Sequence, residues 1–437
     1  MTANGGVWRN WARTESVRPK RVERPTSAAA VQRAVAAAGR SALPIKAVGA
    51  GHSFTGIAVA PGVQLDLTDL AGVISVDEAT HRVTLAAGTH LYQLPRLLAP
   101  YGLALANMGD IDRQTISGAT STGTHGTGSA WGGLATQIVA MTLVVGDGSL
   151  LHVSETENSE LLPAVRLGLG ALGIIVDLTI QCVPAYLLQA VEAAEPLGDI
   201  LDTFQERSLA SDHFEFYWFP HTETALTKTN TRLPIDAQRA PLGRLSRFVD
   251  DEVMANGLYR VTCALGTVVP PLIPGFSRMA EKLSGRREFT DVSPRVFVTN
   301  RTVRFREMEY ALPREVIPDV LREVKALIHR RGWRISFPIE VRSAAADDVW
   351  MSTANGRETG YIAVHRYYRE DQTEYFRDIE AIMRSHNGRP HWGKMHTQDA
   401  DALRGSYPHF DDFIAVRDRL DPDRRFANPY LERVLGR

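Results

Sequence analysis

The chain has 437 residues, which is long enough for two domains that each bury a hydrophobic core. Its composition, 44% hydrophobic and 23% charged, is typical of a folded soluble protein and excludes a disordered chain. The 49 Lys and Arg residues balance the 50 Asp and Glu residues, so the overall charge does not indicate a nucleic acid partner. The two cysteines, Cys182 and Cys263, are too few for a disulfide framework or a cysteine-rich metal centre.

Residues 1–25 lack the apolar core of a secretory signal, so we expect a cytoplasmic protein without an integral membrane segment. The longest apolar tract, 264–276, contains three prolines and is too short to span a bilayer. We expect a proline-stiffened loop there that covers the core, with a peripheral membrane contact as the alternative.

The first third of the chain alternates helical and strand patterns. Residues 25–40 predict a helix with Thr26 or Ser27 as N-cap and Gly39 just past its end. Residues 91–102 predict a helix interrupted by Pro95. Strands are expected at 43–48, 62–67, 81–88 and 138–153, the last as a hairpin that turns at 146–148. This pattern indicates an α+β domain that runs to about residue 180.

The segment GLGALG at 168–173 matches the dinucleotide-binding pattern G-x-G-x-x-G. That pattern binds a pyrophosphate when a strand precedes it and a helix follows, because the helix N-terminus faces the phosphates. Here a helical pattern precedes it and a strand pattern follows at 174–183, so the order is reversed. A nicotinamide-binding Rossmann domain is therefore disfavoured.

From about residue 185 the pattern changes to strands in which aromatic and charged residues alternate. Helices are expected at 312–332 and 373–388, and the Arg-rich piece 236–252 is expected to be an exposed loop. A sheet with helices on one face fits a second α+β domain. Its strands are expected at 212–220, 295–312, 333–342 and 360–369.

Two glycine-rich regions suggest an anion-binding site. VGAGHSFTG at 48–56 follows a predicted strand and exposes backbone N–H groups of the kind that bind phosphate, with an ordinary glycine turn as the alternative. Residues 107–133 are rich in Gly, Thr and Ser and are suited to line a long polar cofactor, with a disordered linker as the alternative. His125 in this region is interpreted as structural, bonding to backbone across the turn.

These motifs resemble a known flavoprotein family. VGAGHSFTG, NMGDIDRQTISGATSTGTHGTG and GLGALGII resemble the PCMH-type FAD-binding domain of the vanillyl-alcohol-oxidase superfamily. HFEFYWFPHT, PIEVR, HWGK and LDPDRRFANPYLERVLG resemble its sugar-1,4-lactone oxidase branch, which includes gulonolactone and arabinonolactone oxidoreductases and has alditol oxidases as near relatives. The resemblance covers nearly the whole chain. It implies an FAD-binding domain at 1–183 and an α+β substrate (cap) domain with an antiparallel sheet at 184–437, whose end from about residue 390 returns toward the flavin.

The resemblance implies FAD as the cofactor. It places His52 where family members form a covalent bond to the 8α methyl of the flavin, and an imidazole nitrogen is a competent nucleophile for that bond. Non-covalent FAD, with His52 hydrogen-bonded within the loop, is the alternative. Gly49, Gly51 and Ser53 would cradle the pyrophosphate. The other cofactor-binding residues that the resemblance implies are Val48, Ala50, Gly109, Asp110, Ser117, Gly118, Ser121, Thr122, Gly123, Gly126, Gly173, Ile174 and Lys394.

Glu340 and Arg342 lie at i and i+2 of a predicted strand, so their side chains share one face of the sheet. A structural ion pair is one interpretation. The resemblance implies instead that they lie over the flavin and bind substrate hydroxyls or the lactone carbonyl. It also places Lys394 near the flavin, where a cation stabilises the reduced form, and His391 and Trp392 in the pocket wall.

Further residues bear on the substrate and on the electron acceptor. His365 and Tyr367 share a strand face where alditol oxidases contact substrate, but those relatives have a smaller hydroxyl residue in place of Tyr367. They also have a serine in place of Asp110, and both departures favour a lactone substrate. Gly109 leaves room for O2 beside the flavin, which fits an oxidase; a quinone, a cytochrome or a dye is the alternative acceptor.

The expected reaction is oxidation of the C2 hydroxyl of an aldono-1,4-lactone, such as L-gulono-1,4-lactone, by hydride transfer to flavin N5. The 2-keto product would enolise to ascorbate or an analogue. The alternatives are an alditol oxidase that acts on a terminal hydroxyl and a flavin-binding protein without turnover. We expect no metal ligands, and the candidate catalytic residues are Glu340, Arg342, Lys394, Asp110 and His391.

Overall fold

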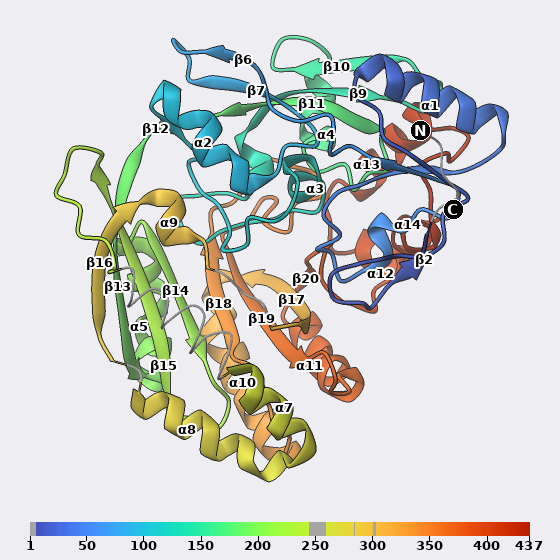
Figure 1. Ribbon diagram of the computed structural model, residues 1–437. Helices are drawn as coiled ribbons and strands as arrows, with labels where there is room; N and C mark the ends of the chain where they lie inside the picture. The colour runs from blue at the N-terminus through green and yellow to red at the C-terminus, as the bar shows by residue number, and fades with distance from the viewer. Residues whose placement is uncertain (1–5, 244–258, 284, 300–302) are drawn as a thin grey trace.

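The computed structural model describes residues 6–243, 259–283, 285–299 and 303–437. The chain forms an α+β fold of two domains: an N-terminal part with several small sheets and a cap domain with one large sheet (Figure 1). Across those residue ranges, no helix is both long and apolar enough to cross a membrane.

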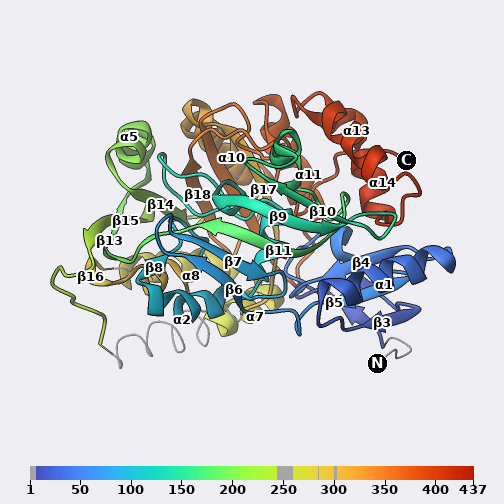
Figure 2. The same cartoon turned by 90° about the horizontal axis from the view of Figure 1, so that it is seen from above.

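Two sheets form the frame of the N-terminal part. The first is parallel, in the order β3–β5–β4, and the second is antiparallel, in the order β10–β9–β11–β7–β6. Helix α1 (Ala28–Arg40) connects β3 to β4 and contacts β9 and β11, so the two sheets lie side by side around one core (Figure 2). The strands are β3 (Arg21–Glu23), β4 (Ile45–Val48), β5 (Val63–Asp66), β6 (Val73–Asp77), β7 (Arg82–Ala86), β9 (Ile138–Val144), β10 (Leu150–Ser154) and β11 (Ile174–Gln181).

Short elements complete this part of the fold. Strands β1 and β2 form a two-stranded sheet near the N-terminus, and β12 pairs with β8. Helix α3 begins with Thr115 as its N-cap. The elements are β1 (Trp8–Arg9), β2 (Ser16–Val17), α2 (Leu94–Leu98), β8 (Leu103–Ala104), α3 (Ile116–Ser121), α4 (Leu162–Val165) and β12 (Val183–Pro184).

The cap sheet is antiparallel throughout, in the order β16–β13–β15–β14–β18–β19–β17–β20. Helices α5 (Leu197–Ala210), α10 (Ile317–Arg331) and α11 (Thr373–Ser385) cover one face and bury its apolar side chains (Figure 1). The other face meets the N-terminal part and carries polar side chains. The strands are β13 (Tyr186–Pro196), β14 (His213–Trp218), β15 (Thr224–Pro234), β16 (Arg287–Val292), β17 (Phe305–Pro313), β18 (Ile339–Ala344), β19 (Thr359–Tyr367) and β20 (Arg389–Pro390).

The last segment of the chain leaves the cap sheet and packs on the N-terminal part. Asn428 Nδ2 donates to the carbonyls of Gly56 (3.0 Å) and Val59 (2.9 Å). The buried Lys46 Nζ donates to the carbonyl of Phe426 (3.0 Å). These bonds attach the C-terminal segment to β4 and to the turn that follows it. The helices of this segment are α12 (Ala400–Arg404), α13 (Phe410–Leu420) and α14 (Pro429–Leu435).

Several expectations from the sequence are confirmed. Ser27 caps α1, and its hydroxyl accepts a hydrogen bond from the Ala30 N–H. The hairpin of β9 and β10 turns at 145–149. Helix α4 precedes GLGALG and strand β11 follows it, which is the reverse of a Rossmann motif.

Other expectations are wrong, and most of these errors share one physical cause. Pro95 lies in the first turn of α2 rather than interrupting a helix, and Pro294 starts α9 (Ser293–Phe297) where a strand was expected from residue 295. The tract 264–276 is helical, within α7 (Tyr259–Val268), a short 3-10 turn, and α8 (Ile273–Leu283). Proline lacks an N–H that a first turn leaves unpaired in any case, so it begins helices as readily as it ends them.

Three remaining differences are local. Gly39 lies inside α1, where the absence of a side chain lets the Arg425 guanidinium approach the helix. Residues 333–338 precede β18 without belonging to a strand. Of the expected loop at 236–252, residues 236–243 are largely exposed, and the rest, like 300–302 of the expected strand, lies outside the described residues.

Candidate active site

A groove runs along the loop after β4 and the loops around α3. The backbone turn at 48–53 forms one wall, and the 169–175 segment lies in the lining as well. The expected cofactor-binding residues in the lining are Val48, Gly49, Ala50, Gly51, His52, Ser53, Ser117, Gly118, Ser121, Thr122, Gly173 and Ile174.

The lining suits a long ligand that carries phosphate groups. A Cβ at Gly49 would lie 2.5 Å from Thr115 Oγ1, so glycine is needed for the two loops to close on each other, and Gly51 has a φ of +69°. Among the described residues that line the groove, Lys46 and His52 are basic and none carries a carboxylate. The residues present therefore fit FAD, whose pyrophosphate the backbone of the 48–53 turn would hold.

His52 is half-buried in the wall of this groove. Burial, together with the nearby cations Lys394 and Arg113, lowers the pKa of its imidazole to about 4, so the ring is neutral at pH 7. Within the ranges that the structure describes, no hydrogen bond engages either ring nitrogen of His52. The ring therefore presents an uncharged nitrogen lone pair and is not tied to its own loop.

A second cavity lies between the polar face of the cap sheet and the loop that follows β8. Gln114 lines both spaces, so this cavity adjoins the groove. Side chains from β17, β18 and β19 form its wall on the cap side. The lining residues are Gly109, Asp110, Ile111, Gln114, Thr124, His125, Phe305, Glu307, Glu309, Glu340, Arg342, His365, His391 and Lys394.

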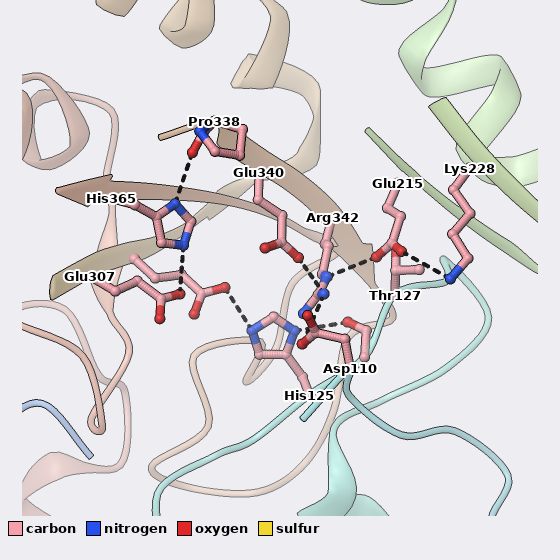
Figure 3. Close-up of polar contacts among 12 residues, drawn as sticks. Asp110, His125, Thr127, Glu215, Lys228, Glu307, Pro338, Glu340, Arg342 and His365 are labelled. Atoms are coloured by element: carbon pink, nitrogen blue, oxygen red, sulfur yellow. Dashed lines mark hydrogen bonds and ion pairs between the residues drawn. The ribbon is translucent and has the colours of Figure 1, made fainter. Parts of the chain in front are cut away.

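Arg342 lies at the centre of three carboxylates in this cavity wall (Figure 3). It pairs with Glu340 on its own strand, its Nε donates to Glu215 Oε2 of β14 (2.9 Å), and its Nη2 is 3.3 Å from Asp110 Oδ1. Burial alone would lower the pKa of Arg342, but Glu340, Asp110 and Glu215 hold it well above its usual value. The guanidinium is therefore charged and fixed in orientation.

Lys394 lies between two glutamates of β17. Its Nζ pairs with Glu307 and is 3.9 Å from Glu309 Oε2. Burial would raise the pKa of Glu307, but Lys394 and His365 lower it to about 2. Partial burial lowers the pKa of Lys394, and the two glutamates raise it above its usual value. All three groups are therefore ionised at neutral pH.

Histidines lie at both ends of this row of charges (Figure 3). His365 Nδ1 is 2.9 Å from the Pro338 carbonyl, and its Nε2 is 3.5 Å from Glu307 Oε1. His125 Nδ1 contacts a backbone carbonyl of its own turn at 2.8 Å, and its Nε2 is 3.0 Å from Glu309 Oε1. The backbone contact expected for His125 is confirmed. Each ring donates one N–H to a carbonyl and turns its other nitrogen to a carboxylate, so a proton can be held between histidine and glutamate.

His125, Glu309 and His391 are close enough together to resemble a metal site. His391 Nδ1, however, accepts a hydrogen bond from the Gly393 N–H (3.0 Å), so in the neutral ring the other nitrogen carries the proton and is not a ligand. Burial lowers the pKa of His391 to about 4, which keeps the ring neutral. Hydrogen bonds within the protein therefore account for this cluster.

Some expected site residues lie away from both cavities. Gly123, Gly126 and Tyr367 line neither of them. The ring of Tyr367 packs in an apolar cluster, 6.4 Å from that of Phe337 between centroids. Trp392 is fully buried behind the cavity wall, where its Nε1 donates to the Met351 carbonyl.

Sequence reasoning misses three carboxylates of the site. Glu215, Glu307 and Glu309 are all buried on the polar face of the cap sheet. A signal for two of them is present, because Glu307 and Glu309 alternate with apolar residues in the same way as Glu340 and Arg342 do. Glu215 stands between two phenylalanines in a strand pattern, which is an equally unusual place for a charge.

Known proteins match this chain along its whole length. The family described as D-arabinono-1,4-lactone oxidase matches residues 178–434, and the family described as FAD binding domain matches residues 19–154. An L-gulono-1,4-lactone dehydrogenase of Mycobacterium tuberculosis is 43% identical over 98% of this chain and 99% of its own. An L-gulonolactone oxidase of Bos taurus is 34% identical over 99% of this chain and 98% of its own.

A solved structure of cholesterol oxidase from B. sterolicum shares the fold, with a TM-score of 0.84 and 19% sequence identity over 98% of this chain and 96% of that one. That likeness concerns the fold alone, whereas the sequence matches extend to family membership. The chain therefore belongs to the D-arabinono-1,4-lactone oxidase family and carries an FAD-binding domain in its N-terminal part.

Proposed function

We propose that this protein oxidises the C2 hydroxyl of an aldono-1,4-lactone, L-gulono-1,4-lactone or a close analogue, with FAD in the groove. FAD, when bound, supplies the hydride acceptor. The observation that carries the proposal is the pair of cations Arg342 and Lys394, fixed by carboxylates in a cavity that adjoins the groove. The names of the relatives from M. tuberculosis and B. taurus support the substrate class.

Arg342 would bind and orient the lactone. Because three carboxylates hold its guanidinium, it presents its N–H groups in one direction, toward a carbonyl or hydroxyl oxygen of the substrate. Glu340 and Asp110 accept hydrogen bonds from neighbouring hydroxyls. The substrate is thereby held with one carbon toward the groove, which is the positioning that a hydride transfer requires.

Oxidation of an alcohol also releases the hydroxyl proton, which needs an acceptor. We assign this role to His365 together with Glu307, since the Nδ1 of His365 is occupied by a backbone carbonyl and its Nε2 faces Glu307 at 3.5 Å. A proton that arrives at Nε2 is stabilised by the carboxylate beside it. Lys394 would stabilise the negative charge of the reduced cofactor, and the neutral His391 forms the adjacent wall.

The same proposal includes a covalent bond from His52 to the 8α methyl of the flavin, a cytoplasmic location, and dioxygen as the electron acceptor. The ring of His52, which is neutral and has no hydrogen bond to a described residue, supports the bond. Gly109 lines the cavity without a side chain, which supports access for a small acceptor. Acid-precipitated protein that stays yellow and oxygen consumption during turnover would be the matching observations; a colourless pellet or turnover with a dye alone would contradict them.

The experiment that tests the function is an anaerobic absorbance spectrum of the flavin, before and after addition of L-gulono-1,4-lactone and, separately, of xylitol. We expect the lactone alone to bleach the flavin. Bleaching by xylitol alone would reassign the protein as an alditol oxidase. Flavin that neither compound bleaches would refute the proposed substrate class.

A further inference from the structure

The N-terminal segment packs directly on the turn that carries His52. The Trp11 N–H donates to the Gly51 carbonyl (2.8 Å), and Asn10 Nδ2 donates to the Ser53 carbonyl (2.9 Å). These bonds come from a distant part of the sequence and fix the backbone immediately before and after His52. The conformation of the turn is therefore imposed by tertiary contacts as well as by its glycines.

The side chain of Trp11 continues this contact to the histidine ring itself. The two ring planes are 18° from parallel, and their centroids are 5.7 Å apart. Trp11 is in turn held by the edges of two further rings, Phe54 at 6.3 Å and Phe305 at 5.3 Å. Because no hydrogen bond to a described residue fixes the ring of His52, Trp11 is the aromatic contact that restricts its rotation.

We propose that Trp11 is a positioning residue for flavin attachment, which holds the imidazole plane of His52 so that a ring nitrogen points to the 8α methyl. This inference rests on the proposed bond between His52 and the flavin. In that step one C–H bond of the methyl and the N–H bond of the imidazole break, and a C–N bond forms. Two protons and two electrons are released. The electrons pass to the flavin ring and from there to dioxygen, which leaves with the two protons as hydrogen peroxide.

The test compares attachment with binding in the purified full-length chain, prepared free of flavin. Wild type and the variants Trp11→Ala and Trp11→Phe are incubated with FAD in air, and in-gel fluorescence of the acid-precipitated chain reports the covalent fraction over time. We expect Trp11→Ala to keep FAD through gel filtration but to attach it about 10- to 100-fold more slowly, the size of loss that a misplaced reactive group causes. Trp11→Phe keeps an aromatic face and should attach FAD at an intermediate rate.

Phe337→Leu is the matched control, because Phe337 packs against Phe305 in the same apolar cluster, whereas Trp11 is the described ring that stacks on His52. It should attach FAD as fast as wild type. Where Trp11→Ala fails to fold, Trp11→Leu fills the space without an aromatic face, and the same loss is expected.

The possible outcomes distinguish the role of Trp11 from the proposed bond between His52 and the flavin. A wild-type chain that releases all its flavin in acid would refute the His52 bond and this inference with it. A wild-type chain that retains flavin, together with a Trp11→Ala variant that attaches it equally fast, would overturn the role of Trp11 alone. A variant that no longer binds FAD at all would assign Trp11 to cofactor binding and would also overturn the inference.

Discussion

Replacement of Arg342 by methionine tests the centre of the proposed site. Methionine fills similar space but leaves Glu340, Glu215 and Asp110 without the guanidinium that lies among them. Removing one partner of a buried ion pair costs about 3–5 kcal/mol, so we expect the free energy of unfolding to fall by about that amount near pH 7.

The same variant should reduce its flavin slowly. Loss of one fixed donor at a reacting centre lowers a rate constant by about 10²- to 10³-fold, and we expect at least that for anaerobic flavin reduction by L-gulono-1,4-lactone. Stopped-flow absorbance measures the reduction, and urea unfolding followed by tryptophan fluorescence measures the stability. Arg342→Lys should recover part of the stability but not the rate of flavin reduction, because lysine keeps the positive charge but lacks the planar set of N–H donors of the guanidinium.

Arg366→Met is the matched control for this experiment. Arg366 belongs to the same sheet and pairs with Glu370 at 3.0 Å, but it lies on β19 next to His365 and therefore on the opposite face. Its loss should leave flavin reduction unchanged. A wild-type reduction rate in Arg342→Met, or an equal loss of rate in Arg366→Met, would refute the placement of the substrate at Arg342.

Three further predictions concern the groove, the pH dependence and the substrate charge. Gly49→Ala places a Cβ 2.5 Å from Thr115 Oγ1 and should weaken FAD binding, measured by flavin fluorescence titration, about 10-fold or more, while Gly198→Ala, with nothing within 4 Å, should not. Burial lowers the pKa of His213 and His391 to about 4, so the unfolded chain binds more protons than the folded one between about pH 6.5 and 4. Stability should therefore fall as the pH drops through that window, by roughly 2–3 kcal/mol for each histidine, and urea midpoints that stay constant there would contradict the buried neutral state. Open-chain L-gulonate, which carries a carboxylate, should fail to bleach the flavin that the lactone bleaches, and equal bleaching would disprove selection by charge.

The parts of the fold that local patterns determine could be predicted from the sequence. Helix α1 has its own cap and an apolar stripe, and the β9–β10 hairpin has its own turn, so both follow from contiguous residues. The predictions at Pro95 and Pro294 were wrong because proline as a residue type occurs in the first turn of some helices and just after the end of others. Which of these occurs depends on where the preceding chain packs, and that is a tertiary property.

The same division separates the two halves of the candidate site. The groove could be predicted because its lining comes from short glycine- and hydroxyl-rich segments whose residues act through their backbone. The cavity could be predicted in part, through Glu340 and Arg342. Glu307 was not predicted, because the alternation of polar and apolar residues identifies a strand but does not show which face of the strand is buried against another domain. The register of β17 with β19 places Glu307 opposite His365, and long-range pairing alone sets that register.

The groove and the cavity differ in the charges of their linings, and this difference predicts which ligand each of them binds. In the described lining, the groove has no carboxylate and has the backbone of the 48–53 turn, an arrangement that favours a pyrophosphate. The cavity has four carboxylates, Asp110, Glu307, Glu309 and Glu340, against the two cations Arg342 and Lys394. An anionic group is therefore favoured at one end and opposed at the other. This distribution of charge predicts that FAD would bind with its phosphates in the groove. It also predicts that the cavity would take an uncharged polyhydroxylated molecule, which a lactone is and its hydrolysed acid is not.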